Sequence, residues 1–133
     1  MRKNRWLAKT MLAASLASFC SAGLAKSKNY EFFEGQTGIA SYFHDKFHGK
    51  RTASGELYDK FALTAAHASL PFGTLIHVVN LQNNQSVDVK INSRSHRANR
   101  RLLDLSKQAA KELGFLSAGV TKVKITVLRL GEA

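Results

Sequence analysis

Every second residue is apolar along two segments in the second half of the chain, which is the pattern of a strand with one buried and one wet face. These segments are Ser86–Asn92 and Thr121–Leu128. Their apolar positions, which we expect in the core, are Val87, Val89, Ile91, Val123, Ile125 and Val127. In the first segment the positions expected to face water are Ser86, Asp88, Lys90 and Asn92. Further strands are predicted at Gly38–Phe43, Thr74–Asn80 and Leu102–Leu105.

Turn and cap residues connect these strands. Leu81–Gln85 is a polar run of hairpin-loop length between two predicted strands. Ser106 is a favourable N-cap for a short helix at Lys107–Leu113, and Gly114 is a favourable stop. Five or six short strands with one helix, and no repeated strand–helix–strand alternation, predict a mainly β fold. We expect a small closed barrel, because closure removes exposed strand edges.

The first 25 residues are typical of a secretory signal peptide. Basic residues at positions 2, 3 and 5 precede the uncharged, mostly apolar segment Thr10–Leu24, and Gly23-Leu24-Ala25 supplies small residues for a signal peptidase. We expect cleavage after Ala25, export across the inner membrane, and a location in the periplasm or cell envelope. Lipid anchoring at Cys20 is disfavoured, because the bulky Phe19 precedes it where small residues are usual.

The exported part is of single-domain size. Removal of 25 residues from 133 leaves 108, which is enough for one domain and too few for two. We predict an N-terminal arm at 26–37 and the domain at 38–129. No later segment has the 18 or more apolar residues of a membrane-spanning helix. Without Cys20 the exported chain has no cysteine, so no disulfide stabilises it. We expect a monomer.

The exported part is basic. The signal segment holds 4 of the 20 basic residues and none of the 9 acidic ones, which leaves 16 against 9, or +7. Such a surface attracts polyanions. Basic residues gather at Lys50-Arg51 and again at Arg94, Arg97, Arg100 and Arg101, which permits a nucleic-acid interpretation. However, no basic helix or aromatic-interleaved strand accompanies them, and an exported domain meets the acidic cell wall instead, so nucleic acid is not the expected partner.

Two neighbouring segments carry a distinctive residue order. Phe47–Asp59 contains Thr52-Ala53-Ser54-Gly55-Glu56, and Ala62–Thr74 contains a small-residue run that leads to His67. Together they resemble the RlpA family of bacterial cell-wall proteins, and the resemblance extends over Gly38–Leu128. It implies a six-stranded double-psi β-barrel and an endolytic lytic transglycosylase activity on peptidoglycan glycan strands.

The resemblance implies a catalytic role for Glu56. Its carboxyl group would protonate the glycosidic oxygen and then, as a base, assist the sugar's own C6 hydroxyl in closing onto C1, which leaves a 1,6-anhydromuramyl end. Ser93 marks a departure from the family. Where the family pattern is Val-Asn-Asp-Arg-Gly-Pro with a catalytic Asp, this chain has Ile91-Asn92-Ser93-Arg94-Ser95-His96. A serine hydroxyl hydrogen-bonds a sugar but does not protonate a glycosidic oxygen at a useful rate.

Substrate contacts are expected from Tyr42, His67 and Arg94. Tyr42 belongs, with Phe43, Phe47 and Tyr58, to an aromatic group suited to stacking on sugar rings, although aromatic residues also fill small cores. His67 matches the family pattern and is suited to orienting Glu56 or a sugar hydroxyl, while a hydrogen-bonded histidine inside the barrel explains it equally well. Asp104 lies in an Asp-Leu-Ser segment that also matches the family, and we expect it to anchor the barrel.

No cofactor is implied, and a metal site is not expected. His44 and His48 are four residues apart, but they lie in a glycine-containing loop with no cysteine or carboxylate cluster beside them. Two functions stay open: a lytic transglycosylase, and a catalytically inactive peptidoglycan-binding or partner-binding module that keeps the groove. The expected partners are glycan strands and, beside them, proteins of the division machinery or envelope.

Overall fold

The computed structural model describes residues 35–96, 98 and 100–132. The predicted signal peptide, residues 1–25, and residues 26–34 of the predicted arm lie outside this part. The first strand begins at Gln36, two residues earlier than the sequence pattern indicates. No helix among the described residues is long and apolar enough to cross a membrane.

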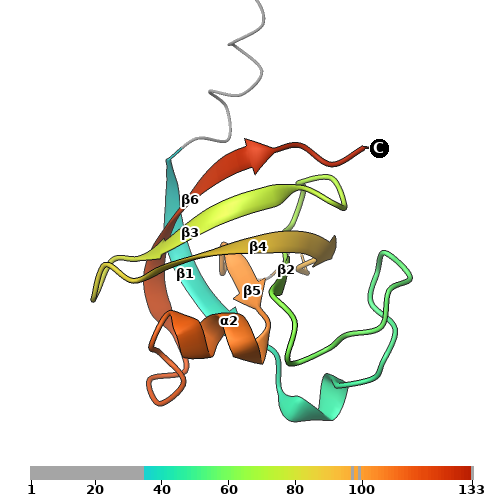
Figure 1. Cartoon of the computed structure of the whole chain (residues 1–133), viewed down its shortest axis with the longest axis horizontal. Helices are drawn as coiled ribbons and strands as arrows, with labels where there is room; N and C mark the ends of the chain where they lie inside the picture. The colour runs from blue at the N-terminus through green and yellow to red at the C-terminus, as the bar shows by residue number, and fades with distance from the viewer. Residues whose placement is uncertain (1–34, 97, 99, 133) are drawn as a thin grey trace, which may run out of the picture. The chain divides into compact units, whose positions relative to one another are not determined.

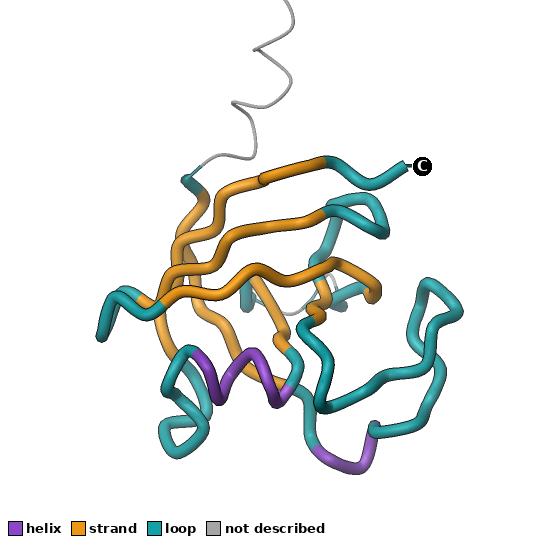
Figure 2. Tube along the Cα trace, viewed as in Figure 1, coloured by secondary structure: helices purple, strands orange, loops and turns teal. Residues whose placement is uncertain are grey.

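The described residues form a closed barrel with the strand order β1-β5-β2-β4-β3-β6 (Figures 1 and 2). The strands are β1 (Gln36–Tyr42), β2 (Thr64–Ala66), β3 (Leu75–Asn80), β4 (Ser86–Ser93), β5 (Leu103–Leu105) and β6 (Thr121–Arg129). β1 pairs in parallel with β5, and β2 in parallel with β4, whereas the other neighbours are antiparallel. Parallel neighbours require connections that cross the barrel. The predicted mainly β, six-stranded double-psi barrel with one short helix is confirmed.

Alternation of apolar and polar residues produces the core. Along β4 and β6 the predicted valine and isoleucine positions are all buried. The pattern fails at Asn92, which is predicted to face water and is only 3% exposed. The amide of Ser54 donates to the Asn92 carbonyl oxygen at 3.3 Å, because the β1–β2 connection folds over this end of β4.

A short helix closes one side of the barrel. α2 (Lys107–Glu112) begins at the N-cap Ser106, whose hydroxyl accepts a hydrogen bond from the Ala109 amide at 3.2 Å, as the sequence predicts. Ala109 and Ala110 are fully buried in the core cluster. The small side chains allow the helix to approach the sheet closely.

The long connection between β1 and β2 is ordered by its own hydrogen bonds. It contains a 3-10 turn, η1 (Asp45–Phe47), and a hairpin in which Gly49 and Tyr58 are linked through the Gly49 amide at 2.8 Å. Tyr58 is 4% exposed, and its hydroxyl accepts a hydrogen bond from the Lys107 amide at 3.1 Å. The connection, which swings outward in Figure 1, is thereby tied to helix α2 and forms one wall of the candidate site.

Candidate active site

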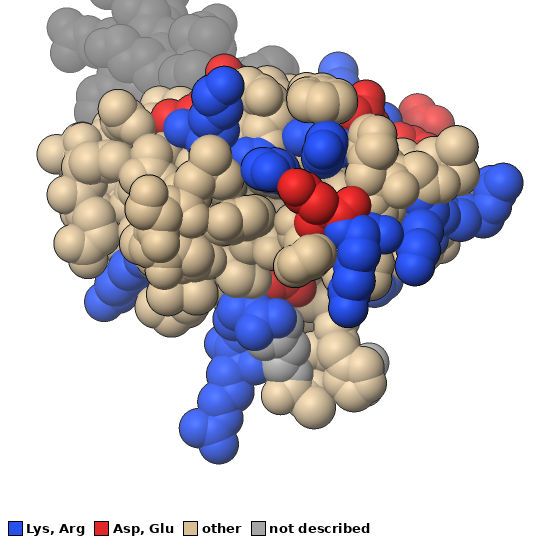
Figure 3. All heavy atoms as spheres, turned by 90° about the horizontal axis from the view of Figure 1, so that it is seen from below, with Lys and Arg blue, Asp and Glu red and all other residues tan. Residues whose placement is uncertain are grey.

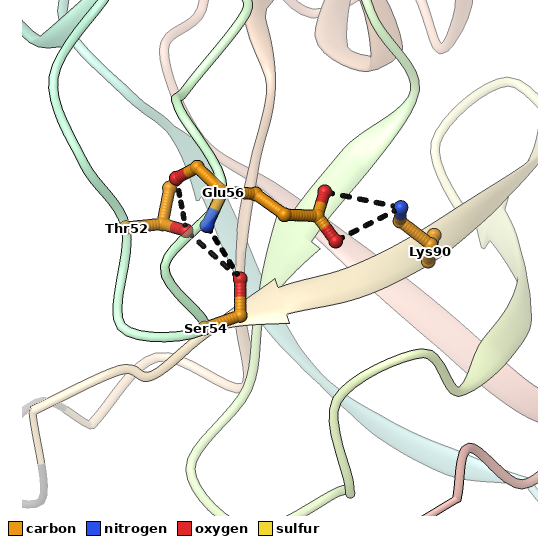
Figure 4. Close-up of polar contacts among 4 residues, drawn as sticks. All are labelled: Thr52, Ser54, Glu56 and Lys90. Atoms are coloured by element: carbon orange, nitrogen blue, oxygen red, sulfur yellow. Dashed lines mark hydrogen bonds and ion pairs between the residues drawn. The ribbon is translucent and has the colours of Figure 1, made fainter.

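The Thr52–Glu56 segment folds as a tight turn that fixes the position of Glu56 (Figure 4). The Thr52 hydroxyl donates to the Glu56 carbonyl oxygen at 2.7 Å, and the Ser54 hydroxyl accepts from the Glu56 amide at 3.3 Å. Gly55 has a φ of 94°, a backbone conformation that residues with a side chain rarely adopt. The turn therefore explains the order Thr-Ala-Ser-Gly-Glu. The threonine hydroxyl donates a hydrogen bond within the turn, the serine hydroxyl accepts one, and the glycine permits the positive φ.

The Glu56 carboxylate forms a solvent-exposed ion pair. Both of its oxygens are 3.1 Å from Nζ of Lys90 on β4, as the dashed lines in Figure 4 mark. About half of each side chain is exposed. An exposed ion pair of this kind contributes about 0–1 kcal/mol, so the carboxylate leaves the lysine at little cost.

Ser93 lines a hollow between β4 and the β1–β2 connection. This Ser93 hollow has a volume of about 200 Å³. Its described lining is Phe43, Phe47, Lys50, Arg51, Thr52, Ala53, Tyr58 and Ser93. Glu56 is not in that lining, although Thr52 and Ala53 of its turn are. The structure thus brings the turn that bears Glu56 to the same hollow as Ser93, whereas the Glu56 carboxylate itself lies against Lys90 outside the lining.

Aromatic rings form one wall of the Ser93 hollow. The ring centroids of Phe43 and Tyr58 are 5.1 Å apart, and those of Phe43 and Phe47 are 6.1 Å apart. Phe47 is 40% exposed. The predicted aromatic group therefore includes rings accessible to a ligand, beside Lys50 and Arg51, which supply positive charge.

His67 is buried directly behind Ser93. Its amide donates to the Ser93 carbonyl oxygen at 3.3 Å, and its Nδ1 accepts from the amides of Ser69 and Leu70, both at 3.1 Å. Burial, and secondarily the nearby Arg94 charge, lowers the pKa of His67 below its usual value of 6.5. A neutral imidazole that accepts at Nδ1 carries its proton on Nε2.

We expect acidification to destabilise the protein through His67. Because the folded state depresses the pKa of His67, the unfolded chain binds a proton more readily, and this contribution to stability is complete above pH 6.5 and declines below it. His67→Asn retains an acceptor near Nδ1 but does not titrate. Urea unfolding above and below pH 6.5 should show the wild type losing stability more steeply than the variant. Parallel pH curves would contradict the assignment.

Arg94 holds the loop that follows β2. Its Nη1 donates to the carbonyl oxygens of Leu70 at 2.6 Å and His67 at 3.3 Å. Its guanidinium also lies 4.2 Å from the centre of the Phe72 ring, a cation–π contact. These contacts fasten the loop that begins at His67 to Arg94, the residue that follows Ser93 in the chain.

Tyr42 is not part of the described lining of the Ser93 hollow. Its hydroxyl donates to the Leu116 carbonyl oxygen at 2.8 Å, and its ring contacts Phe115 edge-on with centroids 5.8 Å apart. It also lines a second hollow, of about 370 Å³. This Asp104 hollow is lined by Ser41, Tyr42, Phe43, His44, Lys46, Phe47, Arg101 and Asp104. Phe43 and Phe47 belong to both hollows, so the two adjoin across these rings.

Asp104 makes the anchoring contacts that the sequence suggests. Its Oδ1 accepts from the Ser41 hydroxyl at 2.7 Å and from Nε of Arg101 at 3.0 Å. His44 and His48 each use Nδ1 as an acceptor for a backbone amide, from Lys46 and Lys60 respectively. Within the part of the chain that the structure describes, no three His, Cys, Asp or Glu side chains gather as a metal site would require.

The face that carries the β1–β2 connection and α2 is rich in cations. Figure 3 views the molecule from this side, and lysine and arginine side chains are spread across it with a few acidic groups between them. Cations also line the two hollows: Lys50 and Arg51 line the Ser93 hollow, and Lys46 and Arg101 line the Asp104 hollow. The arrangement suits an uncharged or acidic polymer laid across the face.

The chain is similar in sequence to known proteins. A family model described as lytic transglycolase matches residues 35–125. The chain is 44% identical over 96 residues to a Campylobacter jejuni subsp. jejuni protein named endolytic peptidoglycan transglycosylase RlpA, an alignment that covers 72% of the chain and 35% of that protein. A Haemophilus influenzae protein of the same name is 46% identical over 95 residues, covering 71% and 33%. The chain spans about a third of the length of these curated relatives.

The fold also has a counterpart among solved structures. Streptomyces papain inhibitor superposes with a TM-score of 0.56 at 22% identity, covering 70% of the chain and 94% of the inhibitor. At this identity the likeness concerns the barrel alone.

Proposed function

The chain belongs to the RlpA-type lytic transglycolase family, and from this membership we propose that it is an endolytic peptidoglycan lytic transglycosylase. In this reaction the glycosidic bond is cut without water, because the C6 hydroxyl of the muramyl residue closes onto C1. The products are a free glycan end and a 1,6-anhydromuramyl end. Peptidoglycan is named as the substrate of the relatives, and we extend it to this chain.

The observation that carries the proposal is the meeting of two distant segments at one cleft. The turn that bears Glu56 and the end of β4 that bears Ser93 lie beside the same hollow, and the Ser54 amide joins them through the Asn92 carbonyl oxygen. Aromatic rings and cations line that hollow. Apolar rings with a few placed polar groups are the usual composition of a ligand site.

We assign Glu56 the role of general acid. Its carboxyl group protonates the oxygen of the departing sugar after the side chain turns from Lys90 toward the hollow. We assign Ser93 to a hydrogen bond with a sugar hydroxyl, because it lies inside the hollow and has no acidic proton to give. His67 and Arg94 hold Ser93 in place, and Tyr42 remains a proposed glycan contact through the adjoining hollow.

A second function is favoured by Ser93 itself. The hollow contains a hydroxyl where the family pattern has a carboxylate, and the remaining family acid, Glu56, is bound to Lys90. A barrel that keeps the groove without the acid would bind glycan and release it uncut. The alternative is therefore a catalytically inactive peptidoglycan-binding or partner-binding module.

Incubation with peptide-stripped glycan separates these functions. Purified protein is mixed with the glycan, and the products are read by mass for 1,6-anhydromuramyl ends. Such ends are the expected result. Retained binding in a pull-down, with no anhydromuramyl ends at any protein concentration, would overturn the enzyme and support the binding module.

We also propose export and an envelope location, in line with the cell-wall substrate named for the relatives. The expected mature protein begins at Lys26, after removal of a signal peptide, and acts as a monomer on glycan strands beside envelope or division proteins. Intact mass of the protein recovered from the envelope checks this prediction. A diacylglyceryl mass on Cys20 would contradict this prediction and identify a lipid-anchored protein.

A further inference from the structure

A third hollow lies between helix α2, at the lower side of the barrel in Figure 1, and the end of the β1–β2 connection. This α2 hollow has a volume of about 140 Å³. Its described lining is Lys60, Phe61, Lys107, Gln108, Lys111 and Leu116. None of these six residues lines the Ser93 hollow or the Asp104 hollow, so the α2 hollow is distinct from the candidate active site.

The α2 hollow is positively charged. Lys107 and Lys111 are four positions apart on α2, which places them on one face of the helix, and Lys60 borders the hollow from the connection. Lys107 pairs with Asp45 at 2.9 Å, whereas Lys60 and Lys111 form no ion pair within the described part of the chain. Like charges four positions apart destabilise a helix, so an anion bound between these lysines relieves a repulsion already present.

The α2 hollow also presents an aromatic ring to water. Phe61 is 69% exposed, more than any other large hydrophobic residue that the structure describes. Its backbone is fixed, because its amide donates to Oδ1 of Asp59 at 2.9 Å and the Gln108 amide donates to the Lys60 carbonyl oxygen at 2.9 Å. The ring contacts His48 edge-on, with centroids 5.8 Å apart, and Nζ of Lys60 lies 5.3 Å from its centre. The ring is therefore preorganised for contact with a ligand.

The charge and the ring together define the chemistry of an occupant. The lysines favour acidic groups, and the Phe61 ring with Leu116 favours an apolar group. The volume is close to the roughly 150 Å³ of a cavity that holds one benzene-sized ring, so one apolar side chain fills it. A peptidoglycan stem peptide has carboxylates but no large apolar side chain, and a layer of lipid headgroups has phosphates but no side chain for the hollow.

We propose that the α2 hollow binds an acidic peptide segment of a partner protein. One apolar side chain of the segment packs against Phe61 and Leu116, and its carboxylates lie beside Lys60, Lys107 and Lys111. None of the residues assigned above to glycan belongs to this lining, so a bound segment occupies no part of the candidate active site.

The test measures binding of a fluorescein-labelled peptide, Glu-Glu-Trp-Glu-Glu, to the full exported protein by fluorescence anisotropy. We expect saturable binding that weakens as salt rises from about 0.05 M to about 0.5 M, because salt screens the attraction between exposed charges. The peptide Lys-Lys-Trp-Lys-Lys reverses the charge, and Glu-Glu-Ser-Glu-Glu removes the ring. Each should bind at least about 10-fold more weakly.

Substitutions locate the binding at the α2 hollow. Phe61→Ser should raise the Kd about 10-fold and Lys111→Gln about 3-fold, since a covered aromatic ring contributes more to affinity than an exposed charge pair. Leu128→Ser and Lys122→Gln make comparable changes at exposed positions of β6 and should leave the Kd as it is. In the wild type, the amide NMR signals of Phe61 and Lys111 should shift on titration and that of Lys122 should not, which tests the location without any substitution.

The outcomes separate the possible occupants. Equal effects in the hollow and β6 variants, or no binding to the wild type at about 1 mM peptide, would overturn the proposal. Self-association in ultracentrifugation that Phe61→Ser abolishes would replace the partner protein with a second copy, whose Tyr30-Glu31-Phe32-Phe33-Glu34 is also acidic and aromatic. Cosedimentation with phosphatidylglycerol vesicles that Lys111→Gln abolishes, without peptide binding, would replace it with a membrane surface. Each measurement is made without glycan and is independent of the proposed cleavage.

Discussion

Ser93→Asp should raise the rate of glycan cleavage by about 100- to 10,000-fold, the usual contribution of one positioned acid or base. Ser93 already lines the hollow, so the new carboxyl group would reach a bound sugar directly, whereas Glu56 must first leave Lys90. Lys50 and Arg51 line the same hollow and offset the added negative charge. The measurement is the initial rate of 1,6-anhydromuramyl-end formation, read by mass.

Ser93→Asn is the matched control for this gain. It has the shape of aspartate and its hydrogen-bonding oxygen but supplies no acidic proton, so its rate should stay near that of the wild type. An equal gain in Ser93→Asn would attribute the effect to shape or hydrogen bonding. No gain in Ser93→Asp, with the circular dichroism of the folded barrel and an already active wild type, would mean that the chain does not need a carboxylate at this position.

Glu56→Gln should remove nearly all cleavage, again by about 100- to 10,000-fold, because glutamine preserves the side-chain length and gives no proton to the leaving oxygen. The turn should survive the change, since its hydrogen bonds involve the Glu56 amide and carbonyl oxygen and not the carboxylate. Rates are compared at saturating glycan, where the loss should lie in kcat.

Lys90→Met tests whether Glu56 matters only as the partner of Lys90. This variant breaks the same ion pair but leaves the carboxyl group free, so it should retain or increase activity. Glu112→Gln, an exposed change on α2, controls for loss of one negative charge. If Lys90→Met loses as much activity as Glu56→Gln, the ion pair and not the acid is what the site requires.

The sequence pattern predicted the strands and the helix whose formation depends on residues close together in the chain. Alternation located β4 and β6, and the Ser106 cap located α2, because each depends on residues close in sequence. The strand β2 was missed: it has three residues, all buried, which is too short to show a period. It exists because β4 and β5 flank it on both sides.

Within the candidate site, the sequence predicted only the part that depends on the turn before Glu56. Thr52, Ser54 and Gly55 are what a tight turn before Glu56 requires, and that requirement is visible in the sequence. The direction in which Asp104 faces is not, because it depends on the register of β5 between β1 and β2. The position of Tyr42 was not predictable from the sequence either, because its hydroxyl donates a hydrogen bond to the carbonyl oxygen of Leu116, 74 positions away.

The contact between Ser41 and Asp104 bears on the order in which the barrel and its candidate site form during folding. Ser41 and Asp104 are 63 positions apart and meet only when β5 docks between β1 and β2. A chain that has formed only the β3–β4 hairpin holds Ser93 without the β1–β2 connection that forms the other wall of its hollow. Contacts of such long sequence separation form late and slowly, because the loop-closure entropy is lost before they form. Folding intermediates of this kind therefore lack the assembled candidate site, which is completed in the same step that closes the barrel.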